Sequence, residues 1–219
     1  MLTVEQRYRF LYKPALFLAC LLPAVLLLAG AFGIAGSDLG PDPVAKLLHS
    51  CGKTALNLLL LTLLVTPVRQ LTGWTHLLRL RRMLGLFAGF YALLHFTVYL
   101  WLDQGFNWPA ILKDIAKRPY ITIGFAALLM LVPLAITSTN RMMRRLGRRW
   151  QQLHRLVYAI AILGVWHYWW QVKRDIRLPA LYVLMLAVLL LWRVAARIRT
   201  RMRRRLTSTS APATAPERT

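Results

Sequence analysis

Histidine is the residue type with the clearest capacity for chemistry in this chain, because a neutral imidazole binds metal ions and exchanges protons near neutral pH. The 219 residues include five histidines: His49, His76, His95, His154 and His167. Two of them, His154 and His167, stand 13 positions apart in the apolar stretch RWQQLHRLVYAIAILGVWHYWW (149–170). His76 lies in a basic segment, where we expect it to be solvated. The two cysteines form no Cys-x-x-Cys pair, which argues against a zinc or iron–sulfur site.

The composition is typical of a membrane protein. Hydrophobic residues make up 58% of the chain, and 29 Lys and Arg against 7 Asp and Glu give a net charge of +22. A charge of this size is also found in proteins that bind nucleic acid. Here, however, the arginine clusters stand between long apolar runs, where the excess of positive charge in cytoplasmic loops already accounts for them. We therefore expect a lipid bilayer as the partner surface and no nucleic acid.

Membrane-spanning helices must position these histidines, and each such helix needs about 20 mainly apolar residues. Six segments meet that requirement, at approximately 14–35, 47–66, 83–102, 120–137, 152–171 and 178–196. The predicted fold class is all-α, a polytopic bundle of six transmembrane helices within residues 1–206. The small, polar and proline-containing residues 207–219 predict a disordered cytoplasmic tail. No internal repeat is evident in the sequence.

The distribution of Lys and Arg predicts the orientation of the bundle in the membrane. Most of them lie in four segments: the N-terminus, the second-to-third loop, the fourth-to-fifth loop and the segment from Arg193 onward. Both termini are therefore predicted to be cytoplasmic, with three short loops facing outward. In the second outward loop, FNWPAILKDIAKRPY (106–120) predicts a short interfacial helix.

Depth in the membrane groups the histidines. At about 1.5 Å of rise per residue, His95 lies about 18 Å along the outward-running third span, and His167 lies about 20 Å beyond His154 on the fifth. His95 and His167 therefore share the outer half of the membrane, where two facing imidazoles can ligate the iron of a b-type haem. Residues on the same helix faces would either leave a slot for a flat ring or permit close packing: Gly85, Ala88, Ala92, Ile160 and Gly164.

The roles of His154 and His49 stay open at this point. His154 lies at the depth of a second, cytoplasmic haem, but the positions that would supply a partner ligand are Arg81 and Arg82. His154 could ligate a haem with another partner, line a flavin or quinone site, or form a structural hydrogen bond. His49 opens the second span near the outer surface, where a quinone contact, another redox role or helix capping would fit. Lys53, one turn later, could stabilise haem propionates or extend to the interface.

Several stretches resemble the MsrQ (YedZ) family, the haem-bearing membrane subunits of bacterial periplasmic methionine sulfoxide reductase systems. These stretches are GPDPVAKLLHSCGKTAL (40–56), RRMLGLFAGFYALLHFTVY (81–99), KRPYITIG (117–124), TSTNRMMRRLGRRWQQLHRLVY (137–158) and WHYWWQVK (166–173). More distantly, the chain is similar to the ferric reductase-like transmembrane domain that NADPH oxidases share.

The resemblance implies a six-helix protein of the bacterial inner membrane that carries b-type haem, one or two per chain, and FMN. His95, His154 and His167 fall on the family's three intramembrane histidines. The implied role is electron transfer rather than catalysis. Electrons would pass from the cytoplasmic side or the quinone pool to a periplasmic molybdopterin-containing methionine sulfoxide reductase, which repairs oxidised periplasmic proteins. Because the sequence ends soon after the sixth span, we expect quinol or a separate cytosolic flavin reductase to supply the electrons.

Two other classes of membrane protein are worth comparing. A transmembrane ferric or cupric reductase acting on soluble metal chelates would use the same haem ligands and would differ in its electron acceptor. A transporter is disfavoured, because no Asp or Glu lies within any of the six spans. The arginine-rich loop 141–149 could bind an acidic flavoprotein or a flavin phosphate, although its role in membrane topology would also explain it.

Overall fold

The computed structural model describes residues 6, 8–34, 38–172 and 175–209, and its regular secondary structure over these residues is entirely helical. The predicted all-α class is confirmed. In chain order the elements are η1 (Tyr8–Tyr12), α2 (Lys13–Ala31), α3 (Pro43–Thr72), α4 (Leu77–Val98), η3 (Tyr99–Asp103), α5 (Trp108–Lys117), α6 (Pro119–Ile136), α7 (Asn140–Leu146), α8 (Arg148–Leu153), α9 (Leu156–Gln171) and α10 (Arg177–Thr209).

Local sequence explains several of the helix ends. Pro43 opens α3, because its fixed φ suits the first turn and its missing N–H has no partner there in any helix. The Asp42 side chain caps the same helix by accepting a hydrogen bond from a first-turn backbone N–H. Asn107 and Thr139 cap α5 and α7 in the same way. Gly73 ends α3 with a φ of 73°, a left-handed conformation that glycine adopts without strain.

Among the described residues, five helical segments are long and apolar enough to cross a membrane: Phe10–Ala31, Pro43–Thr72, Leu77–Asp103, Pro119–Ile136 and Arg177–Met202. They confirm the multi-pass class, but the predicted fifth span, 152–171, is not one continuous helix. A turn at His154 and Arg155 separates α8 from α9. The 16 residues of α9 extend only about 24 Å, less than the ~30 Å hydrocarbon core of a bilayer.

Other predicted boundaries also differ from the structure. α3 extends beyond the expected 47–66 at both ends, so that Pro67 lies inside it. α10 continues to Thr209, and the rest of the predicted tail, 210–219, lies outside the described residues. The predicted interfacial helix is present as α5, with Ile111 buried and Trp108 exposed.

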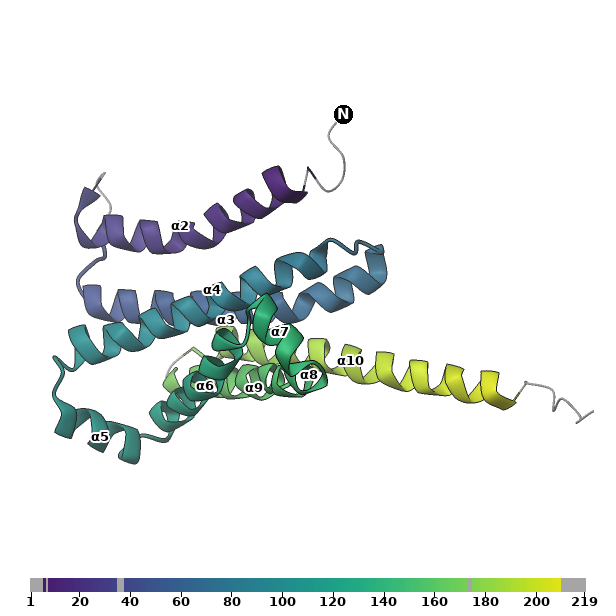
Figure 1. Ribbon diagram of the computed structural model, residues 1–219. Coiled ribbons are helices and arrows are strands. Elements are labelled where there is room, and N and C mark those ends of the chain that lie inside the picture. Colours follow the sequence, from purple (N-terminus) through teal and green to yellow (C-terminus); the bar gives the residue numbers. More distant parts are fainter. Residues whose placement is uncertain (1–5, 7, 35–37, 173–174, 210–219) are drawn as a thin grey trace, which may run out of the picture.

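The bundle is built around two antiparallel helix pairs, α3 with α4 and α6 with α9 (Figure 1). α10 packs on α9 and α3, whereas α2 lies along the outside of the α3–α4 pair. We call one end of the bundle, on the left in Figure 1, the acidic end because the five aspartates of the chain lie there, together with Lys and Arg residues. It contains the starts of α3, α6 and α10, the ends of α4 and α9, and the carboxylates of Asp38, Asp42, Asp103, Asp114 and Asp175.

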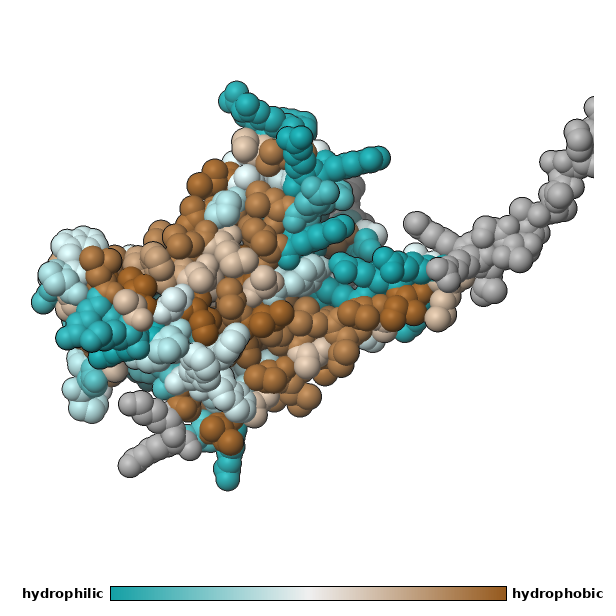
Figure 2. Space-filling model, turned by 90° about the horizontal axis from the view of Figure 1, so that it is seen from below, coloured by the Kyte–Doolittle hydropathy of each residue, from teal (hydrophilic) through white to brown (hydrophobic). Residues whose placement is uncertain are grey.

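The outer surface of the bundle is apolar, as the membrane assignment requires. Exposed leucine and valine side chains cover α2 and α10. Figure 2 shows apolar residues over much of the face seen from below. Because lipid tails are as apolar as leucine, such side chains need no protein partner in a bilayer.

Pro67 leaves a gap in the hydrogen bonds of α3 that a side chain of another helix fills. Proline has no N–H, so the carbonyl of Leu63, four residues earlier, loses its usual helical donor. The guanidinium of Arg193 on α10 donates to this carbonyl and, at 2.9 Å, to the carbonyl of Leu189. Its charged group also lies 5.4 Å from the centre of the Tyr158 ring. Arg193 was grouped by sequence with the cytoplasmic arginines, but it is buried.

Tyr91 fastens the outlying helix α2 to the bundle. Its hydroxyl donates to the carbonyl of Cys20 at 2.8 Å and accepts from the N–H of Ala24 at 2.9 Å. These two backbone groups would bond each other in an unbroken helix. The hydroxyl therefore stands within the hydrogen-bond ladder of α2, next to the helix-internal Pro23.

Candidate functional site

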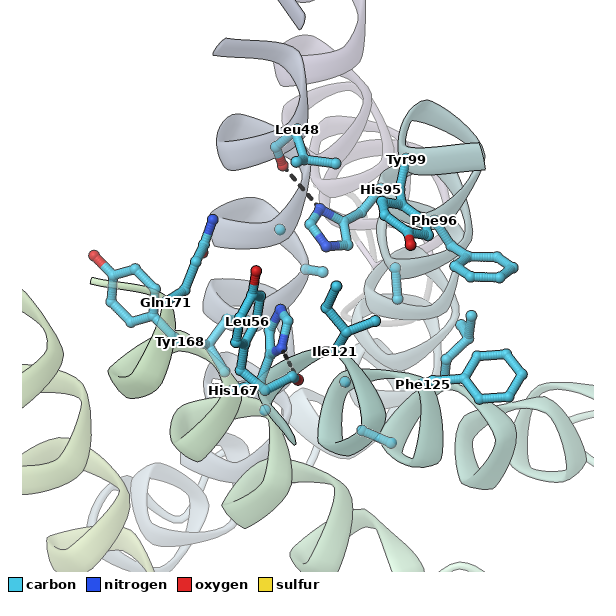
Figure 3. Close-up of a pocket in the computed structure, with 18 of the residues that line it drawn as sticks. Leu48, Leu56, His95, Phe96, Tyr99, Ile121, Phe125, His167, Tyr168 and Gln171 are labelled. Carbon is cyan, nitrogen blue, oxygen red and sulfur yellow. Dashed lines mark hydrogen bonds between the residues drawn. The ribbon is translucent and has the colours of Figure 1, made fainter. Parts of the chain in front are cut away.

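A cavity of about 330 Å³ lies between α3, α4, α6 and α9, towards the acidic end of the bundle. His95 on α4 and His167 on α9 enter it from different helix pairs. Their ring centroids are 6.1 Å apart and their planes are inclined by 80°. Figure 3 shows the two rings facing each other across the cavity. The structure thus brings together the two histidines that the sequence places at one depth.

Each of these rings is held by a backbone carbonyl of the other helix in its pair. Nδ1 of His95 donates to the carbonyl of Leu48 on α3 at 2.8 Å. Nδ1 of His167 donates to the carbonyl of Tyr120 on α6 at 2.6 Å. With the proton on Nδ1, the lone pair belongs to Nε2, and the Nε2 atoms of the two rings face one another (Figure 3). Metal-binding histidines typically donate their second nitrogen to a carbonyl in this way.

A glycine lies against each imidazole, one helical turn after the carbonyl that holds it. A Cβ atom added to Gly52 would lie 3.1 Å from Nδ1 of His95. A Cβ atom added to Gly124 would lie 2.7 Å from Nδ1 of His167. Any larger residue would therefore displace the rings. We did not assign a role to either glycine from the sequence, although both stand within the stretches that carry the resemblance.

The two histidines fit a metal ion held between them. Metal–imidazole bonds of about 2 Å would put the two Nε2 atoms about 4 Å apart, with the ring centres somewhat further. The observed centroid separation of 6.1 Å agrees with this arrangement. The predicted slot is largely present, because Ala88, Ala92, Ile160 and Gly164 line the cavity. Gly85 does not; it faces Thr62 of α3 instead.

Comparison with known proteins gives the family. The sequence model described as "Ferric reductase like transmembrane component" matches residues 51–165. Proteins named "Protein-methionine-sulfoxide reductase heme-binding subunit MsrQ" match most of the chain. The one from Xanthomonas campestris pv. campestris (strain 8004) is 58% identical over 180 residues, 82% of this chain and 83% of its own. The one from Azospira oryzae is 54% identical over 189 residues, 85% and 80% respectively.

The chain belongs to the MsrQ family. Its helices and this membership make it a multi-pass bacterial membrane protein. No solved structure matches the chain.

His154, the third histidine that the MsrQ resemblance marks, lies outside the cavity in the turn between α8 and α9. Its Nε2 lies 3.0 Å from the hydroxyl of Thr137, and its ring stacks on Trp150 at a centroid distance of 4.0 Å. Thr137 donates its own proton to the carbonyl of Pro133, so His154 is the donor in this pair. Arg82, where a partner ligand was sought, bonds the side-chain oxygen of Asn140 instead.

His49 lines the same cavity as His95 and His167, but its ring is bonded on both sides. Nδ1 donates to the carbonyl of Ala45 at 2.5 Å. Nε2 lies 2.9 Å from the side-chain nitrogen of Gln171 on α9, from which it accepts. His49 therefore joins α3 to α9 at the acidic end. His76 lies outside this region, at the residue before α4.

Proposed function

We propose that this chain is the haem-binding membrane subunit of a methionine sulfoxide reductase system and that it transfers electrons through b-type haem. The relatives' names support haem binding and the reductase system. The observation that carries the proposal for this chain is the pair of Nε2 atoms facing each other, each on a ring whose Nδ1 is bonded to a backbone carbonyl. His95 and His167 would hold the haem through its iron.

A haem bound here would supply a one-electron redox centre. The protein's part is to hold both imidazoles neutral and fixed. Leu48 and Tyr120 keep the proton on Nδ1 through their carbonyls, so that each Nε2 presents a lone pair. Two histidines binding the iron would favour electron transfer over oxygen activation.

The charge distribution supports an orientation of the bundle that suits outward electron transfer. The positive-inside rule places the arginine-rich loops in the cytoplasm and the acidic end in the periplasm of a bacterial inner membrane. The cavity would then lie near the periplasmic surface, where a molybdopterin-containing reductase subunit can accept the electron. The source would be the quinone pool or a cytosolic flavin reductase. FMN would belong to the cytoplasmic side of this path.

The remaining histidines take more limited roles in the proposal. His154 lies towards the cytoplasmic side of the bundle, where it would serve a second haem or a flavin through Nδ1, the nitrogen that Thr137 does not bind. His49, which lines the cavity, would provide a quinone or redox contact at the periplasmic end by giving up its hydrogen bond with Gln171.

Haem quantitation and low-temperature optical spectroscopy on purified variants test the central claim. We expect His95→Ala and His167→Ala each to abolish the bis-imidazole spectrum of the cavity haem, because each removes one of two axial ligands. His76→Ala, which changes a histidine outside the cavity, should leave haem content and spectrum unchanged. Normal spectra in both cavity variants would contradict the assignment.

A further inference from the structure

The cavity is built from two copies of one structural unit. Adding 72 to the residue number converts His95 to His167, Gly52 to Gly124 and Leu48 to Tyr120. In each copy, these residues are the histidine, the glycine that lies against its ring and the residue whose carbonyl accepts from its Nδ1. The same shift relates the rest of the lining, where only Asp103 and Arg118 have no lining counterpart. No internal repeat was evident in the sequence, and the lining of the cavity corrects that expectation.

The helices repeat together with the residues. The α3–α4 pair and the α6–α9 pair both begin and end at the acidic end of the bundle (Figure 1). The copies are therefore parallel repeats, related by rotation about an axis that runs along the bundle and passes between His95 and His167. Membrane proteins commonly use an axis along the membrane normal in this way. A ligand on this axis meets nearly equivalent surroundings on its two faces.

The two copies differ where the cavity is polar. Away from the acidic end they match closely: Leu56 and Leu59 of the first copy correspond to Leu128 and Leu131 of the second. Nearer the acidic end, Lys53 corresponds to Phe125 and Tyr99 to Gln171, and the unmatched Arg118 and Asp103 line the cavity there as well. Two cations, hydrogen-bond donors and the carboxylate of Asp103 thus lie at one end of a cavity that is otherwise mainly apolar and symmetric.

Tyr99 gives this polar end an unused donor. Its hydroxyl is buried and has no hydrogen-bond partner among the described residues. Figure 3 shows it on the cavity side of η3. Arg118 also lines the cavity, and its guanidinium is paired with the carboxylate of Asp114 at 3.2 Å. Buried hydroxyls without a partner are rare, because desolvation without a compensating hydrogen bond is unfavourable. The hydroxyl is therefore placed to bond a ligand in the cavity.

We propose that Tyr99, Lys53 and Arg118 form an anchor for the carboxylates of the cofactor, whose carboxylate edge faces the acidic end and whose apolar edge faces inward. This inference rests on the proposed haem function, because haem is the planar ligand with one carboxylate edge that the facing histidines select. Two cations and a phenolic donor suit a pair of carboxylates, and charge-assisted hydrogen bonds of this kind are strong. The anchor would also hold the cofactor's polar edge nearest the surface from which electrons leave.

Release of haem from the purified full-length protein to excess apomyoglobin measures the anchor directly. We expect Tyr99→Phe and Lys53→Met each to release haem about tenfold faster than the unmodified chain, the factor expected for loss of one hydrogen bond to a charged group. The matched control is Tyr182→Phe, which removes a hydroxyl that bonds Asn57 outside the cavity. Its release rate should not change.

A second experiment tests the anchor without any substitution in the chain. The full-length chain, purified without haem, is reconstituted with haem or with haem dimethyl ester, in which both carboxylates are blocked. We expect the ester to bind at least tenfold more weakly. Equal affinity for both, together with unchanged release from Tyr99→Phe and Lys53→Met, would overturn the anchor while leaving the haem function intact. Failure of the unmodified chain to bind either compound would instead overturn the proposed function itself.

Discussion

At the scale of single residues, the position of each imidazole depends on two groups that carry no side-chain chemistry. A carbonyl fixes the proton on Nδ1, and a glycine leaves room for the ring beside the neighbouring helix. The two glycines differ in closeness, since an added Cβ at Gly124 would meet the ring at 2.7 Å and one at Gly52 at 3.1 Å. Because of this difference, alanine substitutions at the two glycines can distinguish an effect on the position of the histidine from a general effect on the helix.

Gly124→Ala should therefore disturb its histidine more than Gly52→Ala does. Overpacking typically destabilises a protein by about 1–3 kcal/mol. Where this strain falls on the haem-bound state, each 1.4 kcal/mol weakens haem binding roughly tenfold. We expect Gly124→Ala to lower haem content several-fold and to shift the low-spin electron paramagnetic resonance signal, with a smaller shift for Gly52→Ala. The control is Gly89→Ala, where an added Cβ approaches no atom more closely than 3.9 Å. Equal haem content and signals in all three variants would contradict the positioning role.

At the scale of the helix, prolines inside membrane segments determine which side chains must be buried. Pro67 removes a donor from α3, and Arg193 replaces it from α10. A buried cation without a carboxylate beside it is unfavourable by itself. Here it is held by two carbonyls and the face of Tyr158. The irregularity of one helix thus accounts for the charge inside the bundle and ties α10 to α3.

Arg193→Met should lower the free energy of unfolding in detergent by about 2 kcal/mol, because it removes hydrogen bonds from a charged donor. Pro67→Ala restores an N–H for the Leu63 carbonyl. In that background, Arg193→Met should therefore lower the free energy of unfolding by a measurably smaller amount. Arg197→Met, at an exposed position on the same helix, should have little effect. Thermal unfolding of the unmodified chain, the three single variants and the Pro67→Ala/Arg193→Met double variant gives the comparison. If Arg193→Met lowers the free energy of unfolding equally in both backgrounds, the hydrogen bond to the Leu63 carbonyl does not account for the stabilisation by Arg193.

At the scale of the whole molecule, the two helix pairs are related by an axis along the bundle, and the charged residues at the two ends of this axis differ. Both helix pairs begin and end at the acidic end, and the arginine-rich helices α7 and α8 lie at the opposite end. Since the cavity lies towards the acidic end, the orientation of the bundle decides which compartment the electron can reach. Membrane topology is therefore part of the functional argument.

Cysteine labelling measures that orientation. With an impermeant maleimide on spheroplasts, Lys113→Cys on α5 should react, because the acidic end is expected to face outward. Arg144→Cys on α7 should react only after permeabilisation. Both positions are exposed. The native Cys20 and Cys51 are buried, so the unmodified chain should give little background. The reverse pattern would place the cavity next to the cytoplasm.

Much of this architecture is readable from the sequence because helix geometry is local. Apolar run length predicts the spans, Lys and Arg predict the orientation, and a fixed rise per residue puts His95 and His167 at one depth. The fifth span was the exception. Its hydropathy is continuous, but the chain turns at His154, which stacks on Trp150 and bonds Thr137.

The sequence by itself therefore determined the residue types, their depths and the class of protein, because these depend on composition and on the regular rise of a helix. Only the tertiary structure decided which helix faces meet. It paired each imidazole with a carbonyl 47 residues away and buried Arg193 beside the carbonyl that Pro67 leaves without a donor. Within the part of the chain that the structure describes, it also left the hydroxyl of Tyr99 without a hydrogen-bond partner. The repeat of 72 residues became visible in the same way. Its copies agree chiefly where side chains meet the shared cavity, and those contacts exist only once the two helix pairs have come together.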